Sequence, residues 1–339
     1  MMTRKTTLLI MAIVVLVIFL PAVVVSIGGR SGLPFQSANA PSAQGESESE
    51  KGGRWQVRLY RADQGEITVM DLDEYLVGVL LAEMPSSFET EALKAQAVIA
   101  RTYTLHQLRS LGGDGCDKAP GKADICSEST HCQAWLDPGS AAGQGGSGSE
   151  AFRDRIRKAV FDTRGEVVVY QGRLIEAVYH STCGGKTEAS HALWSGGVRP
   201  YLKSINCPYC QHSPHYRGEI LIPFTRLAAA LPQDVALPAA SGDELVLEVA
   251  SETPGGRVKT LSINGTLIEG KELRRLLELP STAFTWEYRE EGLFLITRGR
   301  GHGVGLCQYG ADGAARAGKS YRQIIEFYYP GTEVTKIMP

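Results

Sequence analysis

The chain has 339 residues, a formal net charge of −2 and 43% hydrophobic residues. A chain of this length has ample material for a hydrophobic core, arranged as one large domain or as two lobes. Its nearly neutral charge provides no basic surface of the kind that binds nucleic acid. Nucleic acid is therefore not expected among its partners.

The first segment of the chain predicts contact with a membrane. Basic residues at positions 4 and 5 precede an uncharged apolar run of 20 residues, Leu8 to Ile27. Such a run can cross a hydrocarbon core of about 30 Å, and the preceding charges predict a cytoplasmic N-terminus with an exported remainder. A cleaved signal peptide is the alternative, because Ala38-Asn39-Ala40 has the form of a cleavage site. We favour a single-pass anchor at residues 1–27, since the run is long for a signal peptide.

Composition also separates the next segments. Residues 28–53 are rich in Gly, Ser, Pro, Ala, Gln and Glu, which predicts a flexible stalk. The globular domain is expected over residues 54–339. Within it, the Gly/Ser-rich segment 138–149 is expected to form a mobile loop.

The globular domain begins with two expected strands, Trp55–Tyr60 and Ile67–Met70, followed by two helices that meet at a corner. Asp71 or Asp73 can cap the first helix, and Pro85 ends it at Met84. The second helix opens near Thr90. The later elements expected from periodicity are helices Phe152–Phe161, Gly270–Leu277 and Tyr321–Tyr328 and strands Val167–Tyr170, Leu174–Tyr179, Leu245–Ala250, Val258–Ile263, Phe284–Tyr288 and Leu293–Thr297.

The order of these elements predicts the fold class. Strands and helices alternate irregularly, without the β-α-β repeat of a parallel sheet. We therefore expect an α+β fold, an irregular mixed two-lobed domain with a central cleft, preceded by a single transmembrane helix.

Glu83 is the first candidate for chemistry. It stands at the end of the first predicted helix, within the apolar run Leu80-Leu81-Ala82-Glu83-Met84. The negative end of the helix dipole and apolar neighbours would both raise the pKa of its carboxyl group. A raised pKa is what a general acid needs near neutral pH. A surface Glu at a helix end is the alternative, and these residues alone do not decide between the two.

Two glycine-rich loops are further candidates. The first, Tyr179 to Glu188, follows a predicted strand, where loops commonly present functional groups, although a hydroxyl-rich surface turn is equally compatible. The second, Gly299 to Gly310, lacks the Gly-Lys-Ser/Thr ending of a phosphate-binding loop. It fits better as the backbone-lined wall of a cleft with His302 and Gln308 projecting. No organic cofactor is expected.

Seven cysteines in an expected exported chain are difficult to pair as disulfides alone. Cys126, Cys132, His131 and Cys116 are close enough in the chain to supply three or four tetrahedral zinc ligands, and we favour structural zinc over a disulfide. A second group contains Cys207 and Cys210. The residues that could complete it are Cys183, His212 and His215.

For this second group, the sequence leaves a metal and a disulfide equally open. A thioredoxin-type role for Cys207 and Cys210 is weaker, because no helix or βαβ pattern follows the pair. The absence of an HExxH motif gives no support to a zinc protease of that type.

Taken together, the chain resembles stage II sporulation protein D, a family of membrane-anchored peptidoglycan-degrading enzymes of spore-forming bacteria. The resemblance covers the chain from about Trp55 to its end. It rests on LLAEMPSSFETEALKAQAVIARTY, ADICSESTHCQAW, YHSTCGGKTE, IEGKELRRLLELPSTAF and GRGHGVGLCQYGADGAARAGKSYRQIIEFYYPGT, which occur in the family's order. Two departures are a missing Trp between Gly301 and His302 and the Gly/Ser insertion near Ala141.

The resemblance implies a lytic transglycosylase whose catalytic Glu is Glu83. Such an enzyme cleaves glycan strands between N-acetylmuramic acid and N-acetylglucosamine and leaves a 1,6-anhydro end, here in septal wall degradation and engulfment during sporulation. The candidates to line the glycan groove are Lys94, Gln96, Arg101, Tyr103, His180, Ser181, Thr182, His302 and Gln308. For Lys94 and Gln96, a structural role is equally open.

The resemblance also bears on the metal and the partners. Some relatives bind zinc at positions matching Cys126 and Cys132 with a His as third ligand; here Cys116 or His131 would have to serve. The implied partners are a cell-wall amidase and a membrane scaffold of the engulfment machinery, and the implied location is the cell membrane with an extracytoplasmic domain. Two other functions remain open, a wall-binding enhancer of a cell-wall amidase and a zinc-dependent amidase or peptidase.

Overall fold

The computed structural model describes residues 54–139, 149–232, 235 and 245–339. The expected anchor at residues 1–27, the expected stalk at 28–53 and residues 140–148 of the Gly/Ser-rich segment lie outside the described residues. Within the described part of the chain, no helix combines the length and the apolar character needed to cross a membrane.

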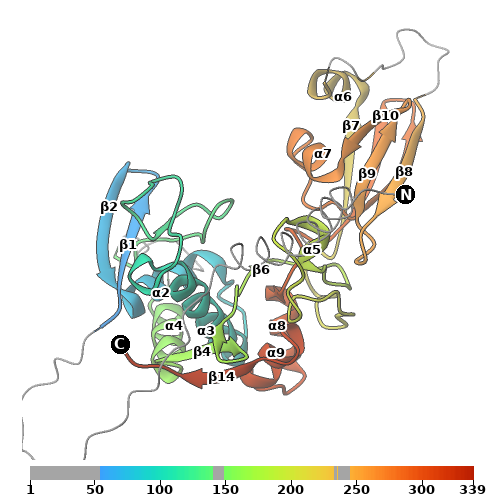
Figure 1. Cartoon of the computed structure of the whole chain (residues 1–339). Helices are drawn as coiled ribbons and strands as arrows, with labels where there is room; N and C mark the ends of the chain where they lie inside the picture. Colours follow the sequence, from blue (N-terminus) through green and yellow to red (C-terminus); the bar gives the residue numbers. More distant parts are fainter. Residues whose placement is uncertain (1–53, 140–148, 233–234, 236–244) are drawn as a thin grey trace, which may run out of the picture. The chain divides into compact units, whose positions relative to one another are not determined.

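The first sheet is built around the N-terminal strands (Figure 1). β1 (Gln56–Arg61) pairs antiparallel with β2 (Glu66–Asp71), which confirms the two strands expected there. On its other edge, β1 pairs in parallel with β3 (Ile125–Cys126), a strand that the sequence did not predict. The sheet therefore fixes Cys126, a cysteine of the loop that follows the second helix.

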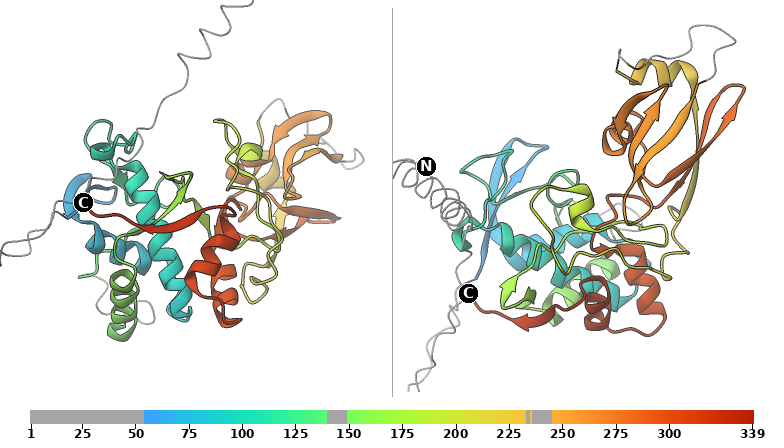
Figure 2. Two further views of the ribbon diagram at one scale, coloured as in Figure 1. Left: turned by 60° about the horizontal axis from the view of Figure 1, so that its bottom comes forward. Right: turned by 45° about the vertical axis from the view of Figure 1, so that its right-hand side comes forward.

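The two expected helices follow directly. α2 (Leu72–Glu83) is capped by the Asp71 side chain, which accepts from the Asp73 amide. Met84 is extended before Pro85, as expected for a residue that precedes proline. α3 (Thr90–Gln107) is buried over most of its length and contacts α4, α8, α9 and β4 (Figure 1, Figure 2). The corner between α2 and α3 anchors in the larger hydrophobic core through Met84 and Phe88, while Ser87 and Glu89 are exposed.

The remaining elements of this core come from the middle and the end of the chain. α4 (Glu150–Asp162) precedes a sheet with the strand order β14-β4-β5. Its strands are β4 (Glu166–Tyr170), β5 (Arg173–Leu174) and β14 (Glu333–Lys336). A two-stranded parallel pair joins β6 (Tyr179–His180) to β13 (Leu306–Cys307), and α8 (Gln308–Arg316) and α9 (Tyr321–Tyr328) follow.

The strand expected over Leu174–Tyr179 is wrong as a single element. Leu174 ends β5, and the Val178 amide then donates to the Glu176 carbonyl, 3.0 Å away, which turns the chain. Tyr179 consequently pairs with Leu306 instead of extending β5 in the sheet formed by β14, β4 and β5. The turn brings the loop after Tyr179 beside the start of α8.

A second hydrophobic cluster is formed by residues between Ile220 and Leu295. Two antiparallel sheets contribute to it, with strand orders β11-β12-β7 and β10-β9-β8. The strands are β7 (Arg217–Pro223), β8 (Leu247–Glu252), β9 (Val258–Ile263), β10 (Thr266–Glu269), β11 (Phe284–Arg289) and β12 (Gly292–Arg298), and the helices are α6 (Phe224–Ala230) and α7 (Gly270–Leu276).

The α+β class is thus confirmed for the described residues, which form several small sheets rather than one large one. The sequence did not predict β7, β10, α6, α8 or the short helix α5 (Ser190–Leu193). The two-lobed shape and the central cleft stay predictions.

Candidate active site

Glu83 is the last residue of α2, and both of its carboxylate oxygens accept hydrogen bonds. The Ala134 amide donates to Oε1 at 2.9 Å, and the Tyr179 hydroxyl donates to the same oxygen at 3.4 Å. The Gln308 side-chain amide donates to Oε2 at 3.2 Å. All three donors are neutral, and they come from three distant parts of the chain. The fold therefore converges on this carboxyl group.

The segment that carries Ala134 is held against α2 by close packing. A Cβ atom on Gly78 would lie 2.1 Å from the indole nitrogen of Trp135, so only glycine permits this approach. The Leu136 amide donates to the Gly78 carbonyl at 3.1 Å. Gly78 lies about one and a half helical turns before Glu83 on α2. Its contacts therefore hold the backbone around Ala134 close to Glu83.

A buried polar network orients Tyr179. The Gln133 side chain donates to the Tyr179 hydroxyl at 3.0 Å and accepts from the hydroxyls of Tyr75 and Thr104 at 3.1 and 3.0 Å. Because the Gln133 nitrogen donates to Tyr179, the Tyr179 proton is free to point at Glu83. The network therefore makes Tyr179 a donor to the carboxyl group.

The surroundings of Glu83 favour its protonated form. Burial raises the pKa of the Glu83 carboxyl above its ordinary value, and the hydrogen bonds from Ala134, Gln308 and Tyr179 oppose part of that rise. Burial also raises the pKa values of Tyr179 and Tyr75 well above the ordinary value of a tyrosine, so both hydroxyls stay protonated. The site can hold a proton and can also stabilise the carboxylate left after its transfer.

The raised pKa of Glu83 predicts a specific pH dependence of stability. A Glu83 carboxyl with a raised pKa in the folded state contributes fully to the free energy of unfolding below its pKa in the unfolded chain, about 4.3. This contribution, measured against a side chain that is always neutral, is lost as the pH rises through the pKa of the folded state. As the pH rises between these two pKa values, we therefore expect the free energy of unfolding of Glu83→Gln to increase relative to that of the wild-type protein. Urea unfolding of both proteins across this range measures the difference, in which metal binding common to both cancels. Parallel curves would contradict it.

Of the residues expected to line the groove, Gln308 lies at Glu83. His180 lies in β6, and His302 lies in the loop that precedes β13. His302 Nε2 donates to the Tyr179 carbonyl at 2.8 Å, and its Nδ1 accepts from the Val304 amide at 3.1 Å. The His180 ring is buried, with Nδ1 3.1 Å from the Val304 carbonyl. Burial lowers the pKa of His302 to about 4 and that of His180 well below its ordinary value. Both rings are therefore neutral; His302 binds the backbone of Tyr179 and Val304, and His180 binds that of Val304.

The structure places three further candidates on α3 in structural contacts. Lys94 forms ion pairs with Glu91 and Asp162 at 3.4 and 3.3 Å. The Arg101 guanidinium is 1% exposed and donates to backbone carbonyls on and beyond α4, including Thr163 at 2.8 Å. The side chain of Gln96 is fully buried, without a hydrogen-bond partner among the described residues. The structure therefore does not bring these three to Glu83.

The remaining candidates differ in exposure. Thr182 is fully buried and bonds the Ser213 hydroxyl at 2.7 Å, whereas Ser181 and Tyr103 are half-buried. The Ser181 carbonyl accepts from the Tyr309 amide at 3.1 Å, which ties this loop to α8. No contact between these three side chains and Glu83 is found among the described residues.

The first cysteine group assembles as a potential metal site. Cys116, Cys126, His131 and Cys132 place their ligand atoms within 4.8 Å of one another. His131 Nδ1 lies 3.2 to 3.6 Å from the three sulfurs, and its Nε2 is 2.5 Å from the Asp117 carboxylate. A carboxylate on the outer ring nitrogen is the usual partner of a metal-binding histidine. The donor set fits a tetrahedral zinc ion. Cys116 and His131, the two alternatives for the third ligand, both belong to it.

A second group contains four buried cysteines, Cys183, Cys207, Cys210 and Cys307, whose sulfurs also lie within 4.8 Å of one another. The sequence placed Cys183, Cys207 and Cys210 together but offered His212 or His215 as a fourth ligand. The structure provides Cys307 instead. All seven cysteines are thus divided between the two groups.

Sequence reasoning missed several residues around Glu83. Gln133 and Ala134 follow Cys132 inside a motif noted for its cysteines, and Tyr179 begins a motif noted for its hydroxyls and glycines. The available signal was proximity in the chain to a candidate metal ligand, because a fixed ligand also fixes its neighbours.

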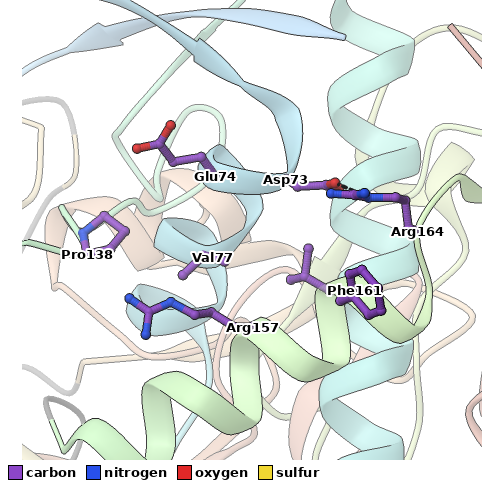
Figure 3. A pocket seen from close by; sticks show the side chains of 8 residues that line it. Asp73, Glu74, Val77, Pro138, Arg157, Phe161 and Arg164 are labelled. Carbon is purple, nitrogen blue, oxygen red and sulfur yellow. Dashed lines mark hydrogen bonds and ion pairs between the residues drawn. The ribbon is translucent and has the colours of Figure 1, made fainter. Parts of the chain in front are cut away.

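The pocket shown in Figure 3 lies between α2 and α4, away from Glu83. Its volume is about 350 Å³, and Asp73 and Arg164 form an ion pair at its edge. Asp73 is at the opposite end of α2 from Glu83, about 15 Å along the helix axis. The lining residues are Asp73, Glu74, Val77, Pro138, Arg157, Val160, Phe161 and Arg164. None of them is a predicted site residue.

Comparison with known proteins gives the class to which this architecture belongs. The profile of the family described as Stage II sporulation protein (SpoIID) matches residues 60–170, which include Glu83 and the first cysteine group. Stage II sporulation protein D of Bacillus subtilis (strain 168) is 34% identical over 296 residues, or 87% of this chain and 83% of that protein. Stage II sporulation protein D of Bacillus amyloliquefaciens is 32% identical over 280 residues, or 83% and 78%. The chain belongs to the stage II sporulation protein D family.

A further relative carries a different name. The amidase enhancer of Bacillus subtilis (strain 168) is 30% identical in an alignment 313 positions long, gaps included, which covers 77% of this chain but 40% of that protein. The relatives therefore connect this chain with sporulation and the cell wall.

Proposed function

We propose that the protein is a peptidoglycan lytic transglycosylase and that Glu83 supplies both proton transfers. The supporting observation is the environment of Glu83: a half-buried carboxyl group with a raised pKa, held by three neutral donors. Most glycosidases need two carboxyl groups, an acid and a base or nucleophile. One is sufficient when the substrate provides its own nucleophile, as the C6 hydroxyl of muramic acid does.

The proton has a natural position on the carboxyl group. Oε1 already accepts from the Ala134 amide and the Tyr179 hydroxyl, whereas Oε2 accepts one hydrogen bond within the described part of the chain, from Gln308. Oε2 therefore has room to carry the proton and to donate it to the glycosidic oxygen of the leaving sugar. The three donors then stabilise the resulting carboxylate. This carboxylate removes the proton from the C6 hydroxyl as that oxygen attacks C1, which closes the 1,6-anhydro ring without water.

The first cysteine group is better suited to structural zinc than to catalysis. Catalytic zinc sites keep one position open for water or substrate, whereas three thiolates and one imidazole fill a tetrahedral shell. His131 with Cys116, Cys126 and Cys132 would hold the ion, and zinc would supply a rigid cross-link there. This closed set of ligands gives no support to a zinc-dependent amidase or peptidase.

The proposed setting follows the same resemblance. A single-pass anchor at residues 1–27 would hold an extracytoplasmic, two-lobed domain with a central cleft close to the wall. Glycan strands would be the substrate, and a cell-wall amidase and a membrane scaffold of the engulfment machinery would be partners. Septal wall degradation during sporulation is the corresponding role.

One relative's name favours a second function. A protein called amidase enhancer matches most of this chain, so a wall-binding role that stimulates an amidase is the alternative. In that case a surface of the domain would bind wall material, and Glu83 would perform no chemistry.

Mass spectrometry of the products separates these functions. Purified glycan strands and intact peptidoglycan are incubated with the full-length protein, and the new ends are identified. A transglycosylase produces 1,6-anhydro ends, a hydrolase produces reducing ends and an amidase releases stem peptides. An enhancer alone produces no new ends but increases the rate of an added amidase. We expect 1,6-anhydro ends, and reducing ends or no ends would exclude the proposal.

A further inference from the structure

The second cysteine group brings together residues that are far apart in the chain. Cys183 follows β6, Cys207 and Cys210 belong to a Cys-x-x-Cys turn, and Cys307 ends β13. All four side chains are at most 2% exposed. Their sulfurs lie within 4.8 Å of one another, with Cys183 and Cys210 at 3.4 Å. Four thiols in one buried sphere are the ligand set of a tetrahedral thiolate metal site.

The sulfur spacing favours a metal over disulfides. A zinc ion bound at about 2.3 Å by four thiolates separates neighbouring sulfurs by about 3.8 Å. Two disulfides would instead bring the sulfurs together in bonded pairs at about 2.05 Å. The distance between Cys183 and Cys210 and the mutual proximity of all four sulfurs correspond to the first arrangement.

Hydrogen bonds to sulfur support thiolate character. The amides of Cys183 and Gly310 both lie 3.2 Å from the Cys307 sulfur, and the Tyr328 hydroxyl lies 3.1 Å from that of Cys207. Donors to sulfur stabilise negative charge on a ligand. A Cβ atom at Gly310 would lie 2.9 Å from the Cys207 sulfur, so the first turn of α8 packs directly on the group.

A buried cation next to the group provides charge compensation. Arg257 is 1% exposed, and its guanidinium donates to the Cys183 carbonyl at 3.3 Å and to the Ser281 hydroxyl at 2.9 Å. Its Nε has no hydrogen-bond partner within the described residues. Zinc with four thiolates carries a net charge of −2, which a buried cation offsets.

The group is also coupled to Glu83 through one residue. Cys307 is the N-cap of α8, and Gln308 is the first residue of that helix. Gln308 donates to Glu83 Oε2 at 3.2 Å. The first cysteine group has the same relation to the other oxygen, because Cys132 lies two residues before Ala134, which donates to Oε1. Each carboxylate oxygen thus receives a hydrogen bond from a residue one or two positions after a cysteine of one group.

We propose that Cys183, Cys207, Cys210 and Cys307 bind a second structural zinc ion, and that this ion fixes the start of α8 so that Gln308 reaches Glu83. Zinc is favoured over iron because it has no redox chemistry, which suits a domain expected on the oxidising side of a membrane. The metal site stands on its own geometry. The role of Gln308 as a positioning residue rests on the proposed function of Glu83.

Metal content tests the site without reference to activity. The full-length protein purified without chelator should contain two zinc ions per chain, and all seven cysteines should be alkylated after denaturation in chelator without reductant. Cys207→Ser should contain one, whereas His212→Ala, which alters the other candidate ligand, should keep two. One zinc in the wild type, iron in the second group, or a disulfide among the four cysteines in non-reducing peptide maps would overturn the proposal. The wild-type measurements decide even if Cys207→Ser does not fold.

The pH profile of glycan cleavage tests the positioning role. The hydrogen bond from Gln308 lowers the pKa of Glu83, whose neighbouring titratable groups Tyr179 and Tyr75 stay neutral. Gln308→Ala and Cys207→Ser should both move the alkaline limb of the profile to higher pH, with activity at least about tenfold lower. A Cys207→Ser profile that is lower but not shifted would refute the coupling. Two zinc ions with no glycan cleavage would refute the proposed function alone.

Discussion

Glu83→Gln should abolish glycan cleavage by the full-length protein while leaving its fold intact. If one carboxyl group is both the acid and the base, the substitution removes both proton transfers at once. General acid–base catalysis contributes roughly 10² to 10⁴-fold per step, so the combined loss should bring activity to background. The formation of 1,6-anhydro ends, followed by mass spectrometry, measures it.

The fold should survive because glutamine can keep the existing contacts. Its amide oxygen can accept from the Ala134 amide and the Tyr179 hydroxyl in place of Oε1. Its amide nitrogen would face Gln308, which can rotate its own amide to accept. A carboxylate at a helix C-terminus is in any case not a stabilising choice.

Glu74→Gln is the matched control, since Glu74 is an exposed carboxylate on the same helix. It should retain wild-type activity. Wild-type cleavage by Glu83→Gln, or an equal loss in both variants, would show that Glu83 does not perform the chemistry.

The sequence predicted those parts of the fold that depend on local signals. Asp71 and Pro85 bracket α2, so both ends of that helix could be placed, and with them Glu83. Residues Val258–Ile263 and Tyr321–Tyr328 form β9 and α9 as expected, because periodicity and flanking turn residues agree there. Local signals therefore located the candidate acid correctly at a helix end.

The surroundings of Glu83 depend on contacts that no local pattern encodes. Ala134, Tyr179 and Gln308 are 51, 96 and 225 residues away from Glu83 in the chain. The two-residue strands β6 and β13 align the last two, and such short strands have no periodicity to detect. The pairing of β6 with β13 also places Cys307 in the second cysteine group. Sequence spacing could therefore propose the cysteine groups but could not complete them.

Arg101 is a different case. It is a candidate to line the glycan groove, yet it is buried and binds carbonyls at the end of α4. Its position on α3 faces the core, and a guanidinium with several donors can satisfy carbonyls left free at a helix end. Residue type alone did not distinguish this role from substrate binding.

Cys126→Ser should release one zinc ion and lower both stability and activity. Cys126 belongs to β3 and Cys132 lies beside His131, so the ion would connect the first sheet to the segment that carries Ala134. Structural zinc contributes apparent binding energies of about 10–16 kcal/mol in small domains, and we expect the free energy of unfolding here to fall by at least about 3 kcal/mol. Denaturant unfolding and elemental analysis measure the two losses.

Activity should fall with stability for a geometric reason. Without the metal, the backbone around Ala134 loses one of its two fixed ends, and the packing of Trp135 on Gly78 remains the other. The donor to Oε1 then becomes mobile, so the carboxylate formed during the reaction is less well stabilised.

Two further variants make the test specific. Ser129→Ala changes an exposed residue between the ligands and should leave zinc and stability unchanged. Asp117→Asn should keep the ion but weaken its binding by about 10 to 100-fold, because the carboxylate orients His131 through Nε2. A Cys126–Cys132 disulfide with no zinc in the wild-type protein would reject the metal site. Equal zinc affinity in Asp117→Asn and wild type would instead show that the charge of Asp117 does not strengthen zinc binding through His131.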